Sequence, residues 1–290
     1  MTPYEPKGSG RQIMIDSKPK TNGHAPPSSQ TPVSAIPVNL TTAAAAVGAQ
    51  REIPSSPKRL ARIAGVLYLL VGIFGGFAQG FLYPKIYVAG DAAKTAGNLI
   101  TNSGLVRIGV VADLFQATVW VFVALTLYRL LRHVNKSAAS AMVVFASIGA
   151  GITMLNAVFE FEGLRVATGA VNLAGFGAAG SNALALLMVD AQHYGLLIAS
   201  IFMGLWLVPL GYLAFRSGWF PKALGVVLIV AGGCYLVDAF AAFLVPDFAK
   251  AIHGYITIPS IIAEVGTLVY LLAIGVNTKK SDERIVAASS

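Results

Sequence analysis

The sequence predicts an all-α membrane protein, a bundle of about six transmembrane helices with both termini in the cytoplasm. Two observations predict this fold class. Of the 290 residues, 56% are hydrophobic and only 12% are charged. The mean hydropathy is +0.69, which is far above the value for a soluble domain of this size. Insertion into a lipid bilayer explains this composition.

The formal net charge of +8 does not indicate a nucleic-acid-binding protein. The basic residues occur in small groups at the ends of apolar segments, whereas a nucleic-acid-binding surface concentrates them on one face. The chain has a single cysteine, Cys234, inside an apolar segment. An intramolecular disulfide and a thiolate metal cluster are therefore both excluded.

Residues 1–55 are rich in Pro, Ser, Thr, Gly and Ala and have no apolar periodicity. Such a segment buries too little apolar surface to offset the entropy lost on ordering, so we expect a disordered, low-complexity cytoplasmic tail. Residues 56–280 then form the membrane domain, and residues 281–290 form a short cytoplasmic tail.

Six apolar segments are long enough to cross the hydrocarbon core, which takes about 20 residues. They are bounded by turn-forming residues such as Pro84 and the pair Ser217-Gly218. The six predicted spans are residues 60–83, 105–131, 138–164, 193–215, 221–245 and 254–276. Pro209 and Pro259 fall within the fourth and sixth spans, where proline kinks or breaks a helix.

Two of the connecting loops have predicted structure of their own. Gly90 and Asp91 precede residues 92–100, which we interpret as a short helix capped by the aspartate and lying at the membrane interface. The loop at residues 166–192 is long, rich in Gly and Ala, and moderately apolar. It suits a re-entrant or surface segment, and a seventh span is the alternative.

Lysine and arginine near the ends of the spans predict the orientation, because cytoplasmic loops retain these residues. Eleven lie on one side: Lys58, Arg59, Arg62, Arg129, Arg132, Lys136, Arg216, Lys222, Lys279, Lys280 and Arg284. Five lie on the other: Lys85, Lys94, Arg107, Arg165 and Lys250. This asymmetry predicts a multi-pass protein of the inner (cytoplasmic) membrane with both termini inside.

Two glycine patterns have ordinary structural interpretations. Residues 175–180 match the dinucleotide fingerprint G-x-G-x-x-G, which functions only at a strand-to-helix turn, so we expect flexible loop backbone here. Gly76 and Gly80 fit the small-xxx-small pattern and predict close helix packing. The sequence has no common metalloprotease, NTPase, thiol or serine-hydrolase motif, and we predict no cofactor, no metal and no assigned catalytic residue.

Polar residues inside the spans are the main functional signal, because an ionisable group in hydrocarbon is costly unless it faces a partner or water. All six predicted spans place polar groups in the same half of the bilayer. The candidate pocket residues are Asp113, Gln116, Asn156, Glu160, His193, Asp238 and Glu264. We expect Asp113, Asp238 and Glu264 to lie close together, or close to Asn156 and Glu160.

Helical spacing also predicts which faces point inward. Thr257, Ser260, Glu264 and Thr267 form one polar stripe on the sixth span. A second stripe on the third span consists of Gly149, Thr153, Asn156 and Glu160. We expect both stripes to face the interior of the bundle.

Several short segments resemble a family of bacterial multi-span membrane proteins, catalogued as domain of unknown function 4386. They are residues 90–95, 127–135, 210–213, 216–218 and 235–238, together with Arg107, Asp113, Pro221 and Gly225. The resemblance covers roughly residues 58–276. It implies a membrane bundle and no particular activity.

Three functions remain open. In the first, an outward-facing polar pocket binds a small solute or protons in transport or sensing. In the second, the protein is a membrane-embedded enzyme that acts on lipid, with the buried acids as acid/base or metal-ligand groups. In the third, it is a structural or assembly partner. The expected partners are the lipid bilayer and a small solute or proton, and no nucleic acid.

The predicted orientation can be tested by cysteine labelling. Cysteines that replace Lys94 and Lys250 should react with a membrane-impermeant thiol reagent added outside, whereas cysteines that replace Lys136 and Lys279 should not. The charge asymmetry at the ends of the spans is the physical reason. Labelling of position 136 from outside would overturn the orientation.

Overall fold

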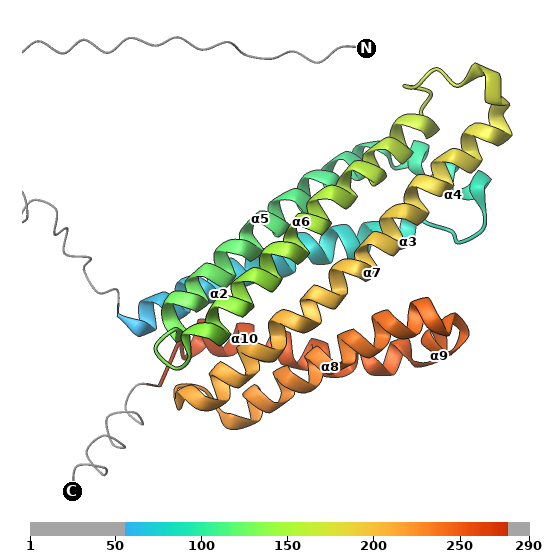
Figure 1. The fold of residues 1–290 in the computed structure, drawn as a ribbon. Coiled ribbons are helices and arrows are strands. Elements are labelled where there is room, and N and C mark those ends of the chain that lie inside the picture. Colours follow the sequence, from blue (N-terminus) through green and yellow to red (C-terminus); the bar gives the residue numbers. More distant parts are fainter. Residues whose placement is uncertain (1–55, 278–290) are drawn as a thin grey trace, which may run out of the picture. The chain divides into compact units, whose positions relative to one another are not determined.

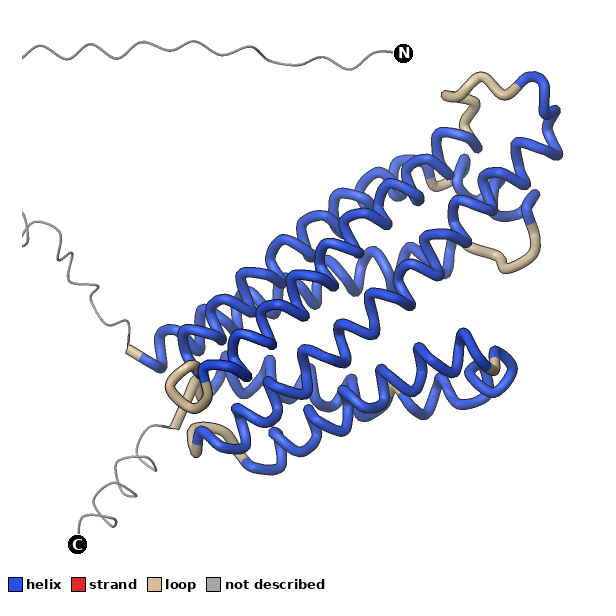
Figure 2. The backbone as a smooth tube through the Cα atoms, viewed as in Figure 1, coloured by secondary structure: helices blue, strands red, loops and turns tan. Residues whose placement is uncertain are grey.

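The structure is a computed structural model that describes residues 56–277. The two predicted tails, residues 1–55 and 281–290, lie outside this range. Within it the backbone consists of helices joined by short loops, and no strand occurs (Figure 2). The all-α fold class is therefore confirmed.

Six helical segments in residues 56–277 are long and apolar enough to cross a membrane, as predicted. Their bounds are Pro57–Ile86, Ser103–Leu131, Lys136–Ala167, Ala174–Ser217, Lys222–Leu244 and Pro246–Ala273. The protein is thus a multi-pass membrane protein. Successive spans run up and down the bundle, so the described chain starts and finishes at one end, while α4 lies at the other (Figure 1). We call the latter the α4 end.

The first span consists of three consecutive helices. Helix α2 (Pro57–Gly75) leads into a seven-residue π-helix, η1 (Gly76–Leu82), which continues as the short α3 (Tyr83–Ile86). The predicted close packing at Gly76 and Gly80 is wrong, since a side chain at either position would meet no neighbouring atom. Both glycines lie in the π-helix, whose buried residues are Ala78 and Leu82.

The short helix between the first two spans is confirmed as α4 (Ala92–Thr101). The Asp91 carboxylate caps it by accepting a 2.9 Å hydrogen bond from the Lys94 amide. This hydrogen bond stabilises the charged form and lowers the pKa of Asp91 below its usual value. The helix buries Ala96 and Leu99 against α6 and α7, so it covers the α4 end of the bundle.

The predicted loop at residues 166–192 is mostly helix, which corrects both the re-entrant and the seventh-span interpretations. Helix α6 (Lys136–Ala167) is followed by a short turn, and η2 (Ala174–Phe176) leads into α7 (Gly177–Ser217). At 1.5 Å per residue, the 41 residues of α7 span about 60 Å, twice the thickness of the hydrocarbon core.

A buried apolar face explains the helical extension of α7 beyond the predicted fourth span. Ala185 and Val189 are fully buried there, in a cluster with Leu99 of α4 and Leu164 of α6. The fingerprint at residues 175–180 lies where this extension begins, and Gly177 has a positive φ of 66°. No strand precedes it among the described residues, so the setting that dinucleotide binding requires is missing there.

The remaining spans are α5 (Ser103–Leu131), α8 (Lys222–Leu244) and a broken sixth span. The sixth span consists of α9 (Pro246–Ile256) and α10 (Ile258–Ala273), and the break precedes Pro259. Helix α7 continues through Pro209 without a break. The two polar stripes face inward as predicted, because Ser260, Thr267, Thr153, Asn156 and Glu160 are all buried.

Helices α7 and α8 pack closely through two pairs of glycines. A Cβ atom added to Gly204 would lie 2.7 Å from the Gly232 carbonyl oxygen, and one added to Gly211 would lie 2.6 Å from that of Gly225. The two pairs are seven residues apart on each antiparallel helix, so the same face of each helix makes both contacts. This close approach brings the backbones of α7 and α8 together.

The adjacent residues Gly232 and Gly233 provide a matched test of this contact. Gly232→Val should destabilise the protein by about 1–3 kcal/mol, because its side chain must displace the α7 backbone. Gly233→Val should have little effect, since a Cβ at that position meets no neighbouring atom. The measurement is the thermal unfolding midpoint of each purified variant in the same detergent. Equal midpoints would show that the glycine contact does not hold α7 and α8 together.

Candidate functional site

Asp113 lies inside the bundle and is bound by two glutamines. Its side chain is on α5, only 2% exposed, and its Oδ1 accepts hydrogen bonds from Gln116 Nε2 at 3.0 Å and Gln79 Nε2 at 3.4 Å. Gln116 is on the next turn of α5, whereas Gln79 comes from the π-helix of the first span. The π-turn thus supplies one of the two donors that this buried carboxylate needs.

Glu160 on α6 is the second buried carboxyl group, and it is 3% exposed. Gln192 Nε2 on α7 donates a 2.8 Å hydrogen bond to its Oε2. One helical turn away, Asn156 faces Gly195 of α7, where any larger side chain would collide with the Asn156 amide. The side-chain atoms Gln192 Oε1 and Asn156 Nδ2 are buried without a hydrogen-bond partner.

Asp113 and Glu160 belong to one polar region. A Cβ atom added to Gly109 would lie 3.4 Å from Glu160 Oε1, and Gly109 is one turn from Asp113 on the same helix. The two carboxyl groups are close enough to interact electrostatically. No lysine, arginine or histidine of residues 56–277 forms an ion pair with either of them.

Glu264 on α10 occupies a different position, between two tyrosines. Its Oε1 accepts a 2.7 Å hydrogen bond from the Tyr235 hydroxyl of α8, and its Oε2 accepts one of 3.3 Å from the Tyr68 hydroxyl of α2. The carboxyl group therefore links three spans. Because tyrosine hydroxyls are neutral donors, this arrangement also leaves the carboxyl group without a basic partner in the described chain.

Asp238 and His193 line a separate pocket of about 250 Å³ between α7, α8 and α9. Both oxygens of the Asp238 carboxylate contact His253 Nδ1, at 3.0 and 3.1 Å. The His193 ring lies against Tyr83 and Tyr87, with ring centroids 6.0 and 5.5 Å apart. This pocket lies at the α4 end of α7 and α8.

The expectation that the three deep acids share one pocket is therefore wrong in part. Asp113 lies close to Glu160, as one form of the expectation required. Glu264 and Asp238 instead have their own partners on other helices. The physical reason is that a tyrosine, an amide or a histidine of a neighbouring helix contacts each carboxylate, so that no shared site is needed.

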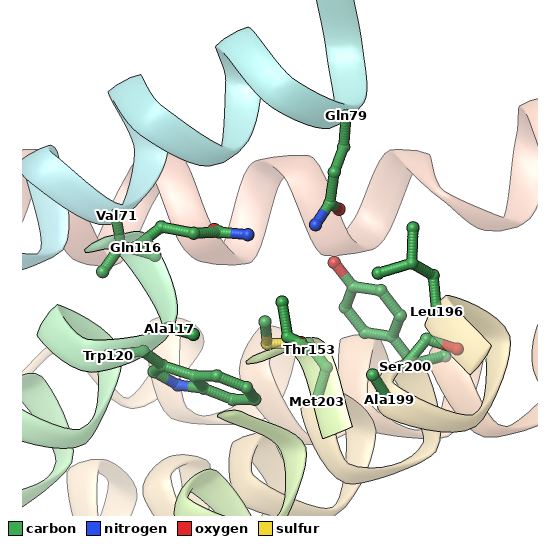
Figure 3. Close-up of a pocket in the computed structure, with 11 residues that line it drawn as sticks. Val71, Gln79, Gln116, Ala117, Trp120, Thr153, Leu196, Ala199, Ser200 and Met203 are labelled. Atoms are coloured by element: carbon green, nitrogen blue, oxygen red, sulfur yellow. The ribbon is translucent and has the colours of Figure 1, made fainter. Parts of the chain in front are cut away.

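A cavity of about 120 Å³ lies beside the Asp113 region. Five spans contribute to its lining, with these residues: Val71, Gln79, Gln116, Ala117, Trp120, Thr153, Leu196, Ala199, Ser200, Met203 and Tyr235. In Figure 3, the amides of Gln79 and Gln116 point into the space above Trp120 and Thr153. This volume holds several water molecules or one very small solute.

The cavity connects two of the three polar groups of residues. Gln79 and Gln116 line it and also bind Asp113, while Tyr235 lines it and also binds Glu264. Gln79 is exposed, so the cavity reaches the surface of the bundle at that residue. A solute in the cavity would thus contact the side chains that hold both buried carboxyl groups.

Several side chains that contact the buried carboxyl groups were missing from the sequence-based candidates. Gln192 was assigned to a loop, although its spacing of three and seven residues from Val189 and Ala185 already indicated a helical face. Tyr68 and Tyr235 carry polar hydroxyls within apolar segments, but no sequence pattern indicates that both contact Glu264. His253 was not identified from the sequence for the same reason, because its partner Asp238 is on another helix.

The described residues contain no group of three or more His, Cys, Asp or Glu side chains that could hold a metal ion. Of the hydroxyl-bearing residues that line the cavity, Thr153 and Ser200 bond to backbone carbonyls of their own helices, and Tyr235 donates to Glu264. The chemistry that this arrangement supports is hydrogen bonding to a small guest and exchange of protons at carboxyl groups.

Comparison with known proteins places the chain in a family. One relative is an uncharacterised protein of Archaeoglobus fulgidus, 28% identical over 124 residues, which are 42% of this chain and 60% of that protein. The match thus spans less than two thirds of that relative. No solved structure matches the chain. The family model of the Domain of unknown function (DUF4386) matches residues 63–275. The chain therefore belongs to the DUF4386 family of membrane proteins.

Proposed function

We propose that this protein binds a small polar solute in the cavity between its spans, and that binding is linked to protonation of the neighbouring carboxyl groups. The role would be proton-linked transport or sensing. The protein would lie in the cytoplasmic membrane of a bacterium, with the α4 end and the cavity toward the outside. The distribution of lysine and arginine at the ends of the spans supports this orientation.

The observation that supports solute binding is a polar cavity inside an otherwise apolar bundle. Apolar side chains would fill such a space at lower cost if it had only a structural purpose. Instead, two amides, two aliphatic hydroxyls and a tyrosine line it, and they come from five different spans. Binding sites of membrane transporters similarly lie between spans near the middle of the bilayer.

The link to protons rests on the buried carboxyl groups. A carboxylate within the membrane costs about 2.5–3.5 kcal/mol or more, and a basic partner would offset that cost. Asp113 and Glu160 have only amide donors. Taking up a proton removes the charge, so the occupancy of the cavity and the protonation of these groups influence each other.

The lipid-enzyme alternative and the assembly alternative have no specific observation in their favour. An enzyme that uses a metal would need a cluster of ligating side chains, and the described residues contain no group of three or more His, Cys, Asp or Glu that could hold a metal ion. An assembly partner does not require a polar cavity.

Solute binding can be tested by thermal stabilisation of the purified full-length protein. The test uses small amines, carboxylates, amides and polyols that fit the cavity. At least one class should raise the unfolding midpoint, since a ligand stabilises the folded state by RT ln(1 + [L]/Kd). Ser200→Phe should abolish the shift by filling the cavity. Ile198→Phe, two residues away and 43% exposed, should preserve it.

Titration calorimetry of the stabilising solute in buffers of different ionisation enthalpy then tests the proton link. Wild-type protein should exchange protons on binding, and the double variant with Asp113→Asn and Glu160→Gln should exchange none. A shift that persists in Ser200→Phe, or the absence of any shift in wild type, would contradict solute binding in this cavity.

A further inference from the structure

We propose that the ligand of this cavity is a small organic cation, a protonated amine of a few non-hydrogen atoms. This inference rests on the proposed function and specifies its ligand class. Carboxylates, neutral amides and sugars are the classes that it excludes.

The charges around the cavity favour a cation. Each of the eleven lining residues is neutral. Two carboxyl groups lie directly behind them, because the lining residues Gln79 and Gln116 bind Asp113 and the lining residue Tyr235 binds Glu264. Glu160 is the electrostatic neighbour of Asp113. An anion placed here would meet only negative or neutral groups in a low-dielectric setting, whereas a cation gains attraction from each ionised carboxylate.

Basic side chains at this end of the bundle are occupied elsewhere. The Arg165 guanidinium pairs with Glu162 at 2.6 Å, and Lys94 pairs with Asp91 at 3.1 Å. The Lys85 ammonium lies 3.9 Å from the centre of the Phe81 ring, and Arg107 lies over Phe161 at 5.7 Å. These interactions keep the cations on the periphery, so the buried carboxyl groups lack counter-charges from the described chain.

Ring systems in the lining favour an organic cation over a bare metal ion. Trp120 and Tyr235 present aromatic surface to the cavity, and an ammonium group over such a ring gains about 0.5–2 kcal/mol. A metal ion instead requires several direct oxygen ligands. Gln79, Gln116 and Tyr235 line the cavity in front of the carboxylates of Asp113 and Glu264. These carboxylates therefore do not line the cavity as the direct ligands of a metal ion would.

Protection of a cysteine against modification tests this ligand class directly. Ser200→Cys is prepared in full-length protein in which Cys234→Ala removes the native thiol, and a small thiol reagent modifies it. Methylammonium chloride should slow the modification severalfold. Sodium chloride, potassium chloride, sodium acetate and acetamide at equal concentration should not. An Ile198→Cys control should react at the same rate in every solution.

Each other outcome overturns the cation inference. If acetamide or acetate protects the cysteine as well as methylammonium does, the cavity binds a solute of another class, and the proposed function stands. If sodium or potassium protects equally, the site takes an inorganic cation. If no solute protects the cysteine, and methylammonium also fails to raise the unfolding midpoint of the unmodified protein, the ligand class is wrong. Protection that survives Asp113→Asn with Glu160→Gln would likewise contradict the charge argument.

Discussion

The need to satisfy buried carboxyl groups in an apolar bundle governs this structure. Each carboxylate that enters the membrane loses its hydration, and a partner on the protein must replace it. Here the partners are mostly neutral: amides for Asp113 and Glu160, and tyrosine hydroxyls for Glu264. Such donors hold a carboxyl group in place without neutralising it, so its charge remains available for interaction with a guest or a proton.

Other features of the fold can be understood from this constraint. The π-helix in the first span allows Gln79 to reach Asp113, and the small side chain of Gly195 leaves room for Asn156. Beside the cavity, glycines bring α7 and α8 into close contact, starting at the pair of Gly204 and Gly232.

The sequence predicted the membrane fold because hydropathy and length largely determine spans. It also identified the polar stripe with Asn156 and Glu160, since helical spacing is a local property. Contacts between helices could not be predicted from the sequence, because the pairing of Glu264 with two tyrosines depends on how three spans pack. The helix before His193 was missed because the segment is rich in Gly and Ala and was interpreted as a loop, although the spacing of Ala185 and Val189 indicates a helical face, which packs against α4 and α6.

The central claim is that a hydrated polar cavity lies beside the buried carboxyl groups. An experimental density map of the full-length protein in lipid, at a resolution that shows ordered water, tests it most directly. The account predicts density for water or a small solute within hydrogen-bonding distance of Gln79 and Gln116, with Asp113 behind them. A map in which apolar side chains close this space, and the two glutamines face lipid, would contradict it.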